Sequence, residues 1–287
     1  MHVELVQTTT PDGLRLWGAL GQASGQPASC LVLCLHGVAS NFYASSLMSS
    51  LGESLNQAGL DVLRVNTRGH DNYCTIGSRD GARRMGAAFE IVDDCRHDIA
   101  GWVELAKERG YQEVILLGHS LGALKVIYSQ AHQPIEEVSS LIAISPPRLS
   151  CQAFLAAETS SLFGESLELA QQRVSEGRGE ELIEIRFPLP LLITARDYLD
   201  KYGPGERYNL LTFIQQVRSP LLVTFGSLEV DQGSIAFAGL AEAVGHATAA
   251  DPNWPGTISV IPGADHHYSD RRDQLASLLT SWLGERS

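Results

Sequence analysis

The chain has 287 residues, 44% of them hydrophobic, and a formal net charge of −12 with 21 Lys and Arg against 33 Asp and Glu. This length suits one α/β domain with a sizeable core, and the acidic balance argues against a nucleic-acid partner, because such proteins usually present a basic face. No apolar run reaches the roughly 18 residues of a membrane span, and the N-terminus lacks a basic region followed by an apolar stretch, so we expect neither a membrane span nor a secretory signal peptide.

The first part of the chain alternates between strand and helix patterns. Val3–Thr8 and Leu14–Leu20 alternate apolar with polar residues on either side of a Pro-Asp-Gly turn, which predicts a β-hairpin. The apolar patterns then predict, in chain order, a strand at Cys30–Leu35, a helix at Tyr43–Ala58, a strand at Asp61–Val65, an irregular loop at Thr67–Phe89 and a helix at Ile91–Arg109.

The same alternation continues to the C-terminus, with one interruption. We predict strands at Val114–Leu117, Val138–Ile144, Leu221–Phe225 and Thr257–Ile261, and a helix at Ala123–Gln130. Alternating strands and helices indicate the α/β class, with a mostly parallel central sheet and helices on both faces. The interruption, from about Arg148 to Arg218, contains a helical pattern at Leu162–Val174 and short apolar runs at Leu182–Ile185 and Leu189–Thr194.

Ser120 lies between two glycines where a predicted strand meets a predicted helix. The segment Gly118–Gly122 has the Gly-x-Ser-x-Gly pattern of a nucleophile elbow, a sharp turn that lifts a serine hydroxyl clear of the sheet edge. Residues two before and two after the serine must be small, because larger side chains would collide with the neighbouring strand and helix. The pattern predicts that Ser120 is a nucleophile.

A serine nucleophile needs a base and an acid that orients the base. On this scaffold the order along the chain is Ser, then Asp or Glu, then His. Glu229 follows the predicted strand at Leu221–Phe225, and His266 follows the strand at Thr257–Ile261. Because ligands bind at the carboxyl ends of parallel strands, we predict a catalytic set of Ser120, Glu229 and His266 at one sheet edge.

These motifs resemble the α/β-hydrolase-fold serine hydrolases, of the esterase and thioesterase kind. The likeness spans nearly the whole chain outside the interruption, and it is carried by Gly118–Gly122, by a strand followed by His36-Gly37, and by Arg68-Gly69-His70. The chain departs from the family in having Glu229 where Asp is usual, and His267 directly after His266. Asp231 is therefore the alternative acid and His267 the alternative base.

The resemblance implies one hydrolase domain over residues 1–287, with a lid or cap inserted at about residues 148–218. It implies an oxyanion hole formed by the backbone N–H groups of Leu121 and Val38. The expected activity is cleavage of an ester or thioester of a small or medium-sized acyl compound through an acyl-enzyme on Ser120. Alternatives are an acyltransferase, lactonase, amidase or C–C hydrolase with the same triad, and a non-catalytic ligand-binding protein on the same fold.

The other histidines have structural interpretations. We expect the His36 ring to hydrogen-bond backbone in the oxyanion loop, His119 to be a core histidine beside the strands, and His70 to anchor its loop. His97 and His132 fall on predicted helices and are expected to pack or face solvent.

The five cysteines, Cys30, Cys34, Cys74, Cys95 and Cys151, are scattered and form no Cys-x-x-Cys pair. Their odd number indicates reduced thiols and a cytoplasmic setting. No His, Cys and Asp cluster has the spacing of metal ligands, so neither a metal nor an organic cofactor is expected. In the interruption, Arg186, Arg196 and Lys201 are possible contacts for an acidic substrate, with surface ion pairs as the alternative. The sequence does not determine the substrate or the oligomeric state.

Overall fold

The computed structural model describes residues 2–24, 28–158 and 160–286. Within these ranges, eight strands form one sheet in the order β1-β2-β4-β3-β7-β8-β11-β12. Their bounds are β1 (Glu4–Thr9), β2 (Arg15–Gly21), β3 (Cys30–Leu35), β4 (Asp61–Val65), β7 (Glu113–His119), β8 (Val138–Ile144), β11 (Leu221–Gly226) and β12 (Gly256–Ile261). The pairs β1–β2 and β2–β4 are antiparallel, and the other neighbours are parallel. The predicted hairpin and the mostly parallel α/β sheet are confirmed.

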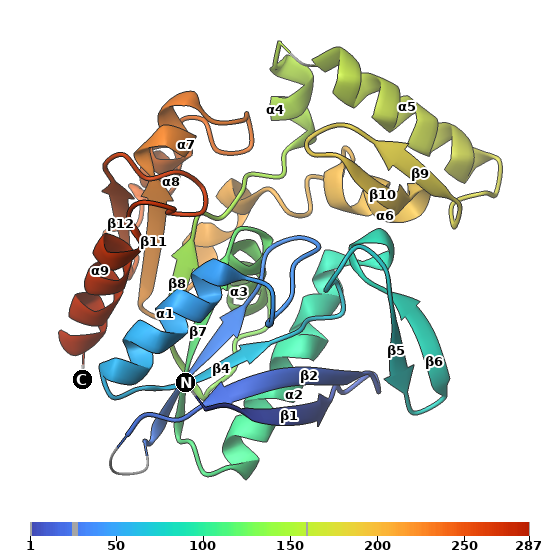
Figure 1. The fold of residues 1–287 in the computed structure, drawn as a ribbon. Helices are drawn as coiled ribbons and strands as arrows, with labels where there is room; N and C mark the ends of the chain where they lie inside the picture. Colours follow the sequence, from blue (N-terminus) through green and yellow to red (C-terminus); the bar gives the residue numbers. More distant parts are fainter. Residues whose placement is uncertain (1, 25–27, 159, 287) are drawn as a thin grey trace.

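Helices cover both faces of this sheet (Figure 1). One face packs against α1 (Ser46–Gln57) and α9 (Arg272–Gly284), and the other against α2 (Cys95–Glu108), α3 (Leu121–His132) and α8 (Leu240–Thr248). In β3, alternate residues belong to different cores: Leu33 joins the core of α2 and α3, and Cys34 joins the core of α1 and α9. A strand buried on both faces is continuously apolar, which is why Cys30–Leu35 carried such a clear signal.

The segment between β8 and β11 forms a separate group of elements at the end of the sheet where β7 and β8 point (Figure 1). It contains α4 (Cys151–Ala156), α5 (Ser160–Ser175), the antiparallel strands β9 (Leu182–Ile185) and β10 (Leu191–Thr194), α6 (Ala195–Tyr202) and the short 3₁₀ turns η3 (Leu210–Thr212) and η4 (Ile214–Gln216). We refer to residues 148–218 as the cap segment.

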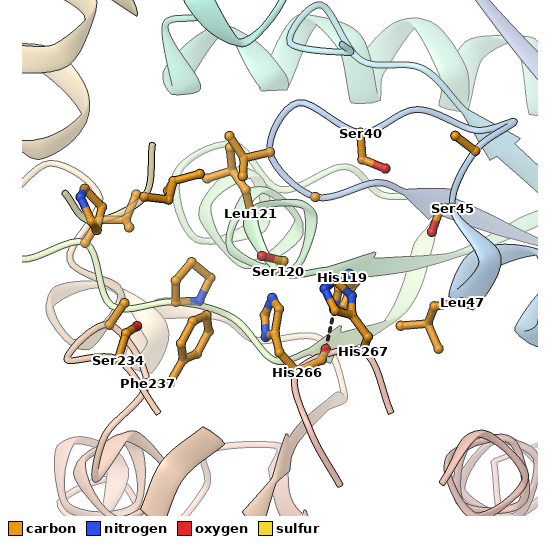
Figure 2. A pocket seen from close by; sticks show the side chains of 18 of the residues that line it. Ser40, Ser45, Leu47, His119, Ser120, Leu121, Ser234, Phe237, His266 and His267 are labelled. Carbon is orange, nitrogen blue, oxygen red and sulfur yellow. Dashed lines mark hydrogen bonds between the residues drawn. The ribbon is translucent and has the colours of Figure 1, made fainter. Parts of the chain in front are cut away.

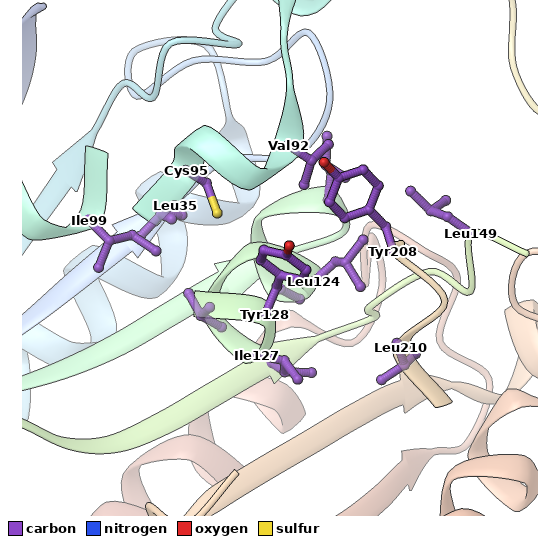
Figure 3. Close-up of a cluster of buried hydrophobic side chains, with 14 of the residues drawn as sticks. Leu35, Val92, Cys95, Ile99, Leu124, Ile127, Tyr128, Leu149, Tyr208 and Leu210 are labelled. Atoms are coloured by element: carbon purple, nitrogen blue, oxygen red, sulfur yellow. The ribbon is translucent and has the colours of Figure 1, made fainter. Parts of the chain in front are cut away.

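The cap segment is anchored on the elbow helix by apolar packing. Figure 3 shows Tyr208 and Leu210 beside Leu124, Ile127 and Tyr128 of α3. The Tyr208 and Tyr128 rings meet edge to face, with their centroids 5.3 Å apart. Such contacts exclude water and add the specific attraction of an aromatic pair. The end of the cap segment is therefore part of the same core as α3.

The prediction that Thr67–Phe89 is an irregular loop is wrong. It contains an antiparallel hairpin of β5 (Cys74–Ser78) and β6 (Gly81–Met85), followed by a 3₁₀ turn, η1 (Ala87–Phe89). Only Ile76 and Ser78 of these two strands are buried, and β6 is mostly exposed. An exposed two-stranded hairpin lacks the apolar alternation by which strands are recognised.

Two predicted helices begin later than their patterns suggested. Helix α1 begins at Ser46, because the Ser45 hydroxyl caps it by accepting a hydrogen bond from the Met48 N–H. Helix α2 begins at Cys95, after a 3₁₀ turn, η2 (Val92–Asp94). A short helix that the patterns did not predict, α7 (Ser227–Gln232), follows β11 and carries Glu229.

Candidate active site

Ser120 occupies a strained turn between β7 and α3. Its backbone has φ 56° and ψ −124°, in a region that a residue with a side chain rarely adopts. A Cβ added to Gly118 would overlap the Gly122 carbonyl, and one added to Gly122 would lie 2.5 Å from the Leu35 carbonyl oxygen. Both positions therefore require glycine, for the steric reason that the motif suggests. The turn leaves Ser120 half-buried at the border of a cavity.

Glu229 is buried, and both of its carboxylate oxygens have fixed partners. Oε1 accepts hydrogen bonds from the Gly226 N–H at 2.8 Å and from the Ser145 hydroxyl at 2.5 Å. Oε2 lies 2.7 Å from His266 Nδ1. Gly226 allows this arrangement, because a Cβ there would overlap the Ala264 carbonyl in the loop that carries His266.

His266 follows β12 and lies between Glu229 and Ser120. A carboxylate accepts hydrogen bonds, so His266 Nδ1 carries the proton and Nε2 keeps a lone pair. Figure 2 shows the His266 ring beside Ser120 and directed toward it. In the described part of the chain no hydrogen bond joins Ser120 Oγ to His266, although both side chains border the same cavity. Such bonds are often long before substrate binds.

His119 holds the backbone of the histidine loop. Its Nε2 donates a hydrogen bond to the His266 carbonyl oxygen at 2.8 Å, drawn as a dashed line in Figure 2. Burial, together with the nearby His266, lowers the pKa of His119 to about 3, so this ring is neutral. The sequence placed His119 beside the strands, but only the structure identifies the carbonyl it holds.

Two further residues around Glu229 were not recognised from the sequence. Ser145 follows β8, has φ 51° and donates to Glu229. The Tyr268 hydroxyl lies 2.9 Å from Ser145 Oγ and 3.2 Å from Thr224 Oγ1. Ser145 could have been found from the sequence, because it is a polar residue directly after a central strand and Glu229 was predicted from its place after a strand.

The two alternative triad residues are both exposed. Asp231 is exposed on α7, whereas His266 contacts Glu229. His267 is exposed at the edge of the cavity, with its ring centroid 5.2 Å from that of His266. The partial loss of hydration beside the surrounding groups, together with the neighbouring His266, lowers the pKa of His267.

Three other histidines make structural contacts. His36 is buried against the backbone of its own loop, with Nδ1 2.7 Å from the Gly37 carbonyl oxygen. His70 Nδ1 lies 2.8 Å from Asp71 Oδ2, and His132 Nδ1 lies 2.9 Å from the Tyr128 carbonyl oxygen.

Both residues predicted to form the oxyanion hole, Val38 and Leu121, line the cavity. The Leu121 N–H belongs to the first residue of α3 and has no partner within that helix. Val38 lies in the loop after β3, and among the described residues its N–H donates to no other backbone group. A Cβ added to Gly37 would lie 3.1 Å from Ser120 Cβ, so this loop backbone is in close contact with the serine.

The cavity has a volume of about 510 Å³ and borders both the sheet edge and the cap segment. Its apolar lining includes Leu149, Pro188 and Leu189 from the cap segment and Phe237 from the loop before α8. On the other side lie the hydroxyl groups of Ser40 and Ser45 (Figure 2). Among the described residues, no Asp, Glu, Lys or Arg lines it.

The predicted acidic-substrate contacts lie outside this lining. Arg186 is exposed, and Arg196 pairs with Glu180 and Asp197. Lys201 is buried and pairs with Glu90. Ion pairs, the alternative interpretation, therefore account for Arg196 and Lys201.

A family model described as the alpha/beta hydrolase family matches residues 32–278. The chain belongs to this family. No curated protein matches it by sequence.

Solved structures share the α/β-hydrolase fold at low sequence identity. Est1E from Butyrivibrio proteoclasticus, solved with bound ferulic acid, has a TM-score of 0.65 and 17% identity over 98% of each chain. The Pyrococcus furiosus esterase Pf2001 has a TM-score of 0.64 and 18% identity, over 99% of this chain and 90% of that one. The alpha/beta hydrolase GrgF from Penicillium sp. sh18 has a TM-score of 0.70 and 17% identity, over 99% of this chain and 97% of that one.

Two features are absent from the part of this α/β-hydrolase chain that the structure describes. No helix there combines the length and the apolar character needed to cross a membrane. Within the same residue ranges, no group of three or more His, Cys, Asp and Glu residues is arranged to hold a metal ion.

Proposed function

We propose that this α/β-hydrolase is a serine hydrolase that cleaves an ester or thioester of a small or medium-sized, uncharged acyl compound. The observation that carries the proposal is the pairing of Glu229 with His266 at 2.7 Å, where His266 lines the same cavity as Ser120 in its strained turn. This combination supplies a nucleophile, a base with a free lone pair and an acid that fixes the base.

The reaction would proceed in two halves. His266 Nε2 takes the proton of Ser120 Oγ as Oγ bonds to the acyl carbon, and the carbonyl π electrons move to its oxygen. The oxyanion accepts hydrogen bonds from the N–H groups of Val38 and Leu121. When the carbonyl re-forms, the bond to the alcohol or thiol breaks, and this leaving group takes the proton from His266. Water then attacks the acyl-enzyme by the same steps, which releases the acid and restores Ser120.

The proposal is tested with a fluorophosphonate probe and p-nitrophenyl esters graded by acyl length. We expect one adduct, located on Ser120 by mass spectrometry, and turnover that Ser120→Ala and His266→Ala each abolish. His267→Ala is the matched control for His266 and should retain turnover. A protein that turns over esters but forms no adduct would contradict the acyl-enzyme, and one that does neither would be a ligand-binding member of the fold.

The acid is tested by Glu229→Gln, with Asp231→Asn as its control. A glutamine amide donates where the carboxylate accepted, so the proton of His266 would move to Nε2 and block its action as a base. The expected loss in kcat is about 10⁴-fold, as in other triads given the wrong tautomer. A harmless Glu229→Gln together with a damaging Asp231→Asn would move the role to Asp231.

A further inference from the structure

A buried ionic cluster lies outside the cavity and has no part in the reaction described above. It consists of Glu90, Lys125 of α3 and Lys201 of α6. Lys125 Nζ lies 2.5 Å from Glu90 Oε1, and Lys201 Nζ lies 3.2 Å from Glu90 Oε2. All three residues are at most 2% exposed, so their charges are shielded little by water.

The Arg68-Gly69-His70 motif makes room for this cluster. A Cβ on Gly69 would overlap the Glu90 carboxylate, so only glycine lets the carboxylate reach its position. The family resemblance identified this motif but did not explain why its second residue is glycine. The position of the Glu90 carboxylate explains it.

Lys125 extends the cluster toward the oxyanion loop. Its Nζ, besides binding Glu90, donates to Thr67 Oγ1 at 3.1 Å. Thr67 Oγ1 lies 3.2 Å from His36 Nε2, and the Thr67 N–H donates to that nitrogen at 3.1 Å. Since Nε2 accepts the backbone N–H, the proton of the His36 ring is on Nδ1. Nδ1 therefore donates to the Gly37 carbonyl oxygen, 2.7 Å away.

The last bond in this series fixes a peptide group at the cavity. The Gly37 carbonyl and the Val38 N–H belong to one planar trans peptide, so they point in opposite directions. With the carbonyl held by His36, the Val38 N–H is directed away from that ring. The cavity borders both Gly37 and Val38.

We propose that Lys125, Thr67 and His36 form a buried relay that orients and polarises the Gly37–Val38 peptide, and that they act as positioning residues for the oxyanion hole. This inference rests on the proposed function of Val38. The ammonium charge of Lys125 strengthens each bond in the series, because successive hydrogen bonds in a dry interior polarise one another. The polarised Val38 N–H stabilises the acyl oxygen most when negative charge develops on it, so the relay lowers the energy of the transition state.

The two buried lysines provide a matched pair of variants. Lys125→Met and Lys201→Met each remove one ammonium from the same carboxylate, and each leaves one Glu–Lys pair. Only Lys125 contacts Thr67. We expect Lys125→Met to lower kcat about tenfold, less than the loss of a whole oxyanion donor, with KM within about twofold of wild type. Lys201→Met should leave both constants within about twofold.

A boronic acid that forms a tetrahedral adduct with Ser120 measures the same effect at equilibrium. Its Ki should rise in Lys125→Met by about the factor by which kcat falls. Active sites are counted by burst titration, and kcat is calculated per active site, so that a smaller folded fraction in a variant does not lower its kcat. Thr67→Val should resemble Lys125→Met, and Thr67→Ser, which keeps the hydroxyl, should restore activity. Equal losses in the two lysine variants, or a change confined to KM or to the number of active sites, would overturn the relay.

The relay also has a readout that does not depend on activity. In ¹⁵N-labelled protein, Lys125→Met should shift the Val38 amide and the His36 ring signals, and Lys201→Met should not. Unmoved signals in Lys125→Met would overturn the relay even if no ester were hydrolysed. Absent turnover in the wild type, with these shifts as expected, would contradict the proposed function alone.

Discussion

At the scale of single residues, the longer side chain of Glu229 is accommodated by the way it leaves α7. Its carboxylate turns back to accept a hydrogen bond from Gly226, three residues earlier, and reaches His266 with the other oxygen. The Ser145 hydroxyl, just after β8, donates a further hydrogen bond to this carboxylate. Three hydrogen bonds therefore hold this carboxylate in place beside the His266 imidazole.

Gly122 offers a residue-scale prediction about stability. In Gly122→Ala the added Cβ would meet the Leu35 and His36 carbonyl oxygens, which belong to backbone and cannot move aside. We expect the free energy of unfolding to fall by about 1–3 kcal/mol, the usual cost of overpacking. The measurement is urea unfolding followed by circular dichroism.

Gly164 is the matched control, because it also lies in a helix, α5, but has open space where its Cβ would be. Gly164→Ala should raise the free energy of unfolding by up to about 1 kcal/mol, since alanine favours the helix. If both substitutions changed stability equally, the close contact at Gly122 would not be what requires glycine there.

At the scale of elements, the cluster around Glu90 ties the cap segment to the core. Helix α3 brings Lys125, helix α6 brings Lys201, and the loop before α2 brings Glu90. Burial alone would raise the pKa of Glu90, but the two ammonium groups outweigh it and lower that pKa to about 2. The Glu90 carboxylate is therefore ionised in the folded protein at neutral pH.

Glu90→Gln should destabilise the protein, because two buried ammonium groups would share a neutral partner. Breaking a buried pair in this way costs about 3–5 kcal/mol. Since the folded pKa of Glu90 is below its ordinary value of 4.5, the stabilisation is fully present above pH 4.5 and is lost as the pH falls toward about 2.

Urea unfolding of wild type and Glu90→Gln at several pH values tests this prediction. The difference between the two proteins should be largest at neutral pH and should shrink below pH 4.5. A difference that did not depend on pH would mean that packing, rather than charge, gives Glu90 its role.

At the scale of the whole molecule, the sheet edge and the cap segment both line the cavity. Its walls combine cap-segment side chains such as Leu149 and Leu189 with hydroxyl groups such as that of Ser40, and no described lining residue is an acid, a lysine or an arginine. An ionised group placed there would lose its hydration without gaining a partner, which is costly.

A pair of substrates of equal chain length tests this neutrality. We expect kcat/KM for p-nitrophenyl hemisuccinate to be at least about tenfold below that for p-nitrophenyl butyrate, since about 1.4 kcal/mol of lost binding suffices for that factor. Measured rates in the opposite order would show that an acidic substrate finds a cationic partner in the cavity.

Much of the architecture was predictable because its signals are local. The strand β3 is a continuous apolar run and β4 and β8 are mostly apolar, and all three were predicted with the bounds that the structure has. Glycine is required at positions 118 and 122 because a Cβ there would overlap backbone atoms of the same turn or of the adjacent strand and the loop after it. The exposed hairpin of β5 and β6 had no such signal and was missed.

Which side chains meet across long distances in the chain depends on the tertiary structure. The α/β fold, the turn at Ser120 and a short set of candidate acids and bases after later strands could be predicted from the amino-acid sequence alone. The sequence could not show that Ser145 would serve Glu229, that His119 would hold the His266 carbonyl, or that Lys201 would be buried on Glu90 rather than meet a substrate. Local patterns report the burial and period of one element, whereas these partnerships depend on how separate elements pack, and packing is set by the whole chain.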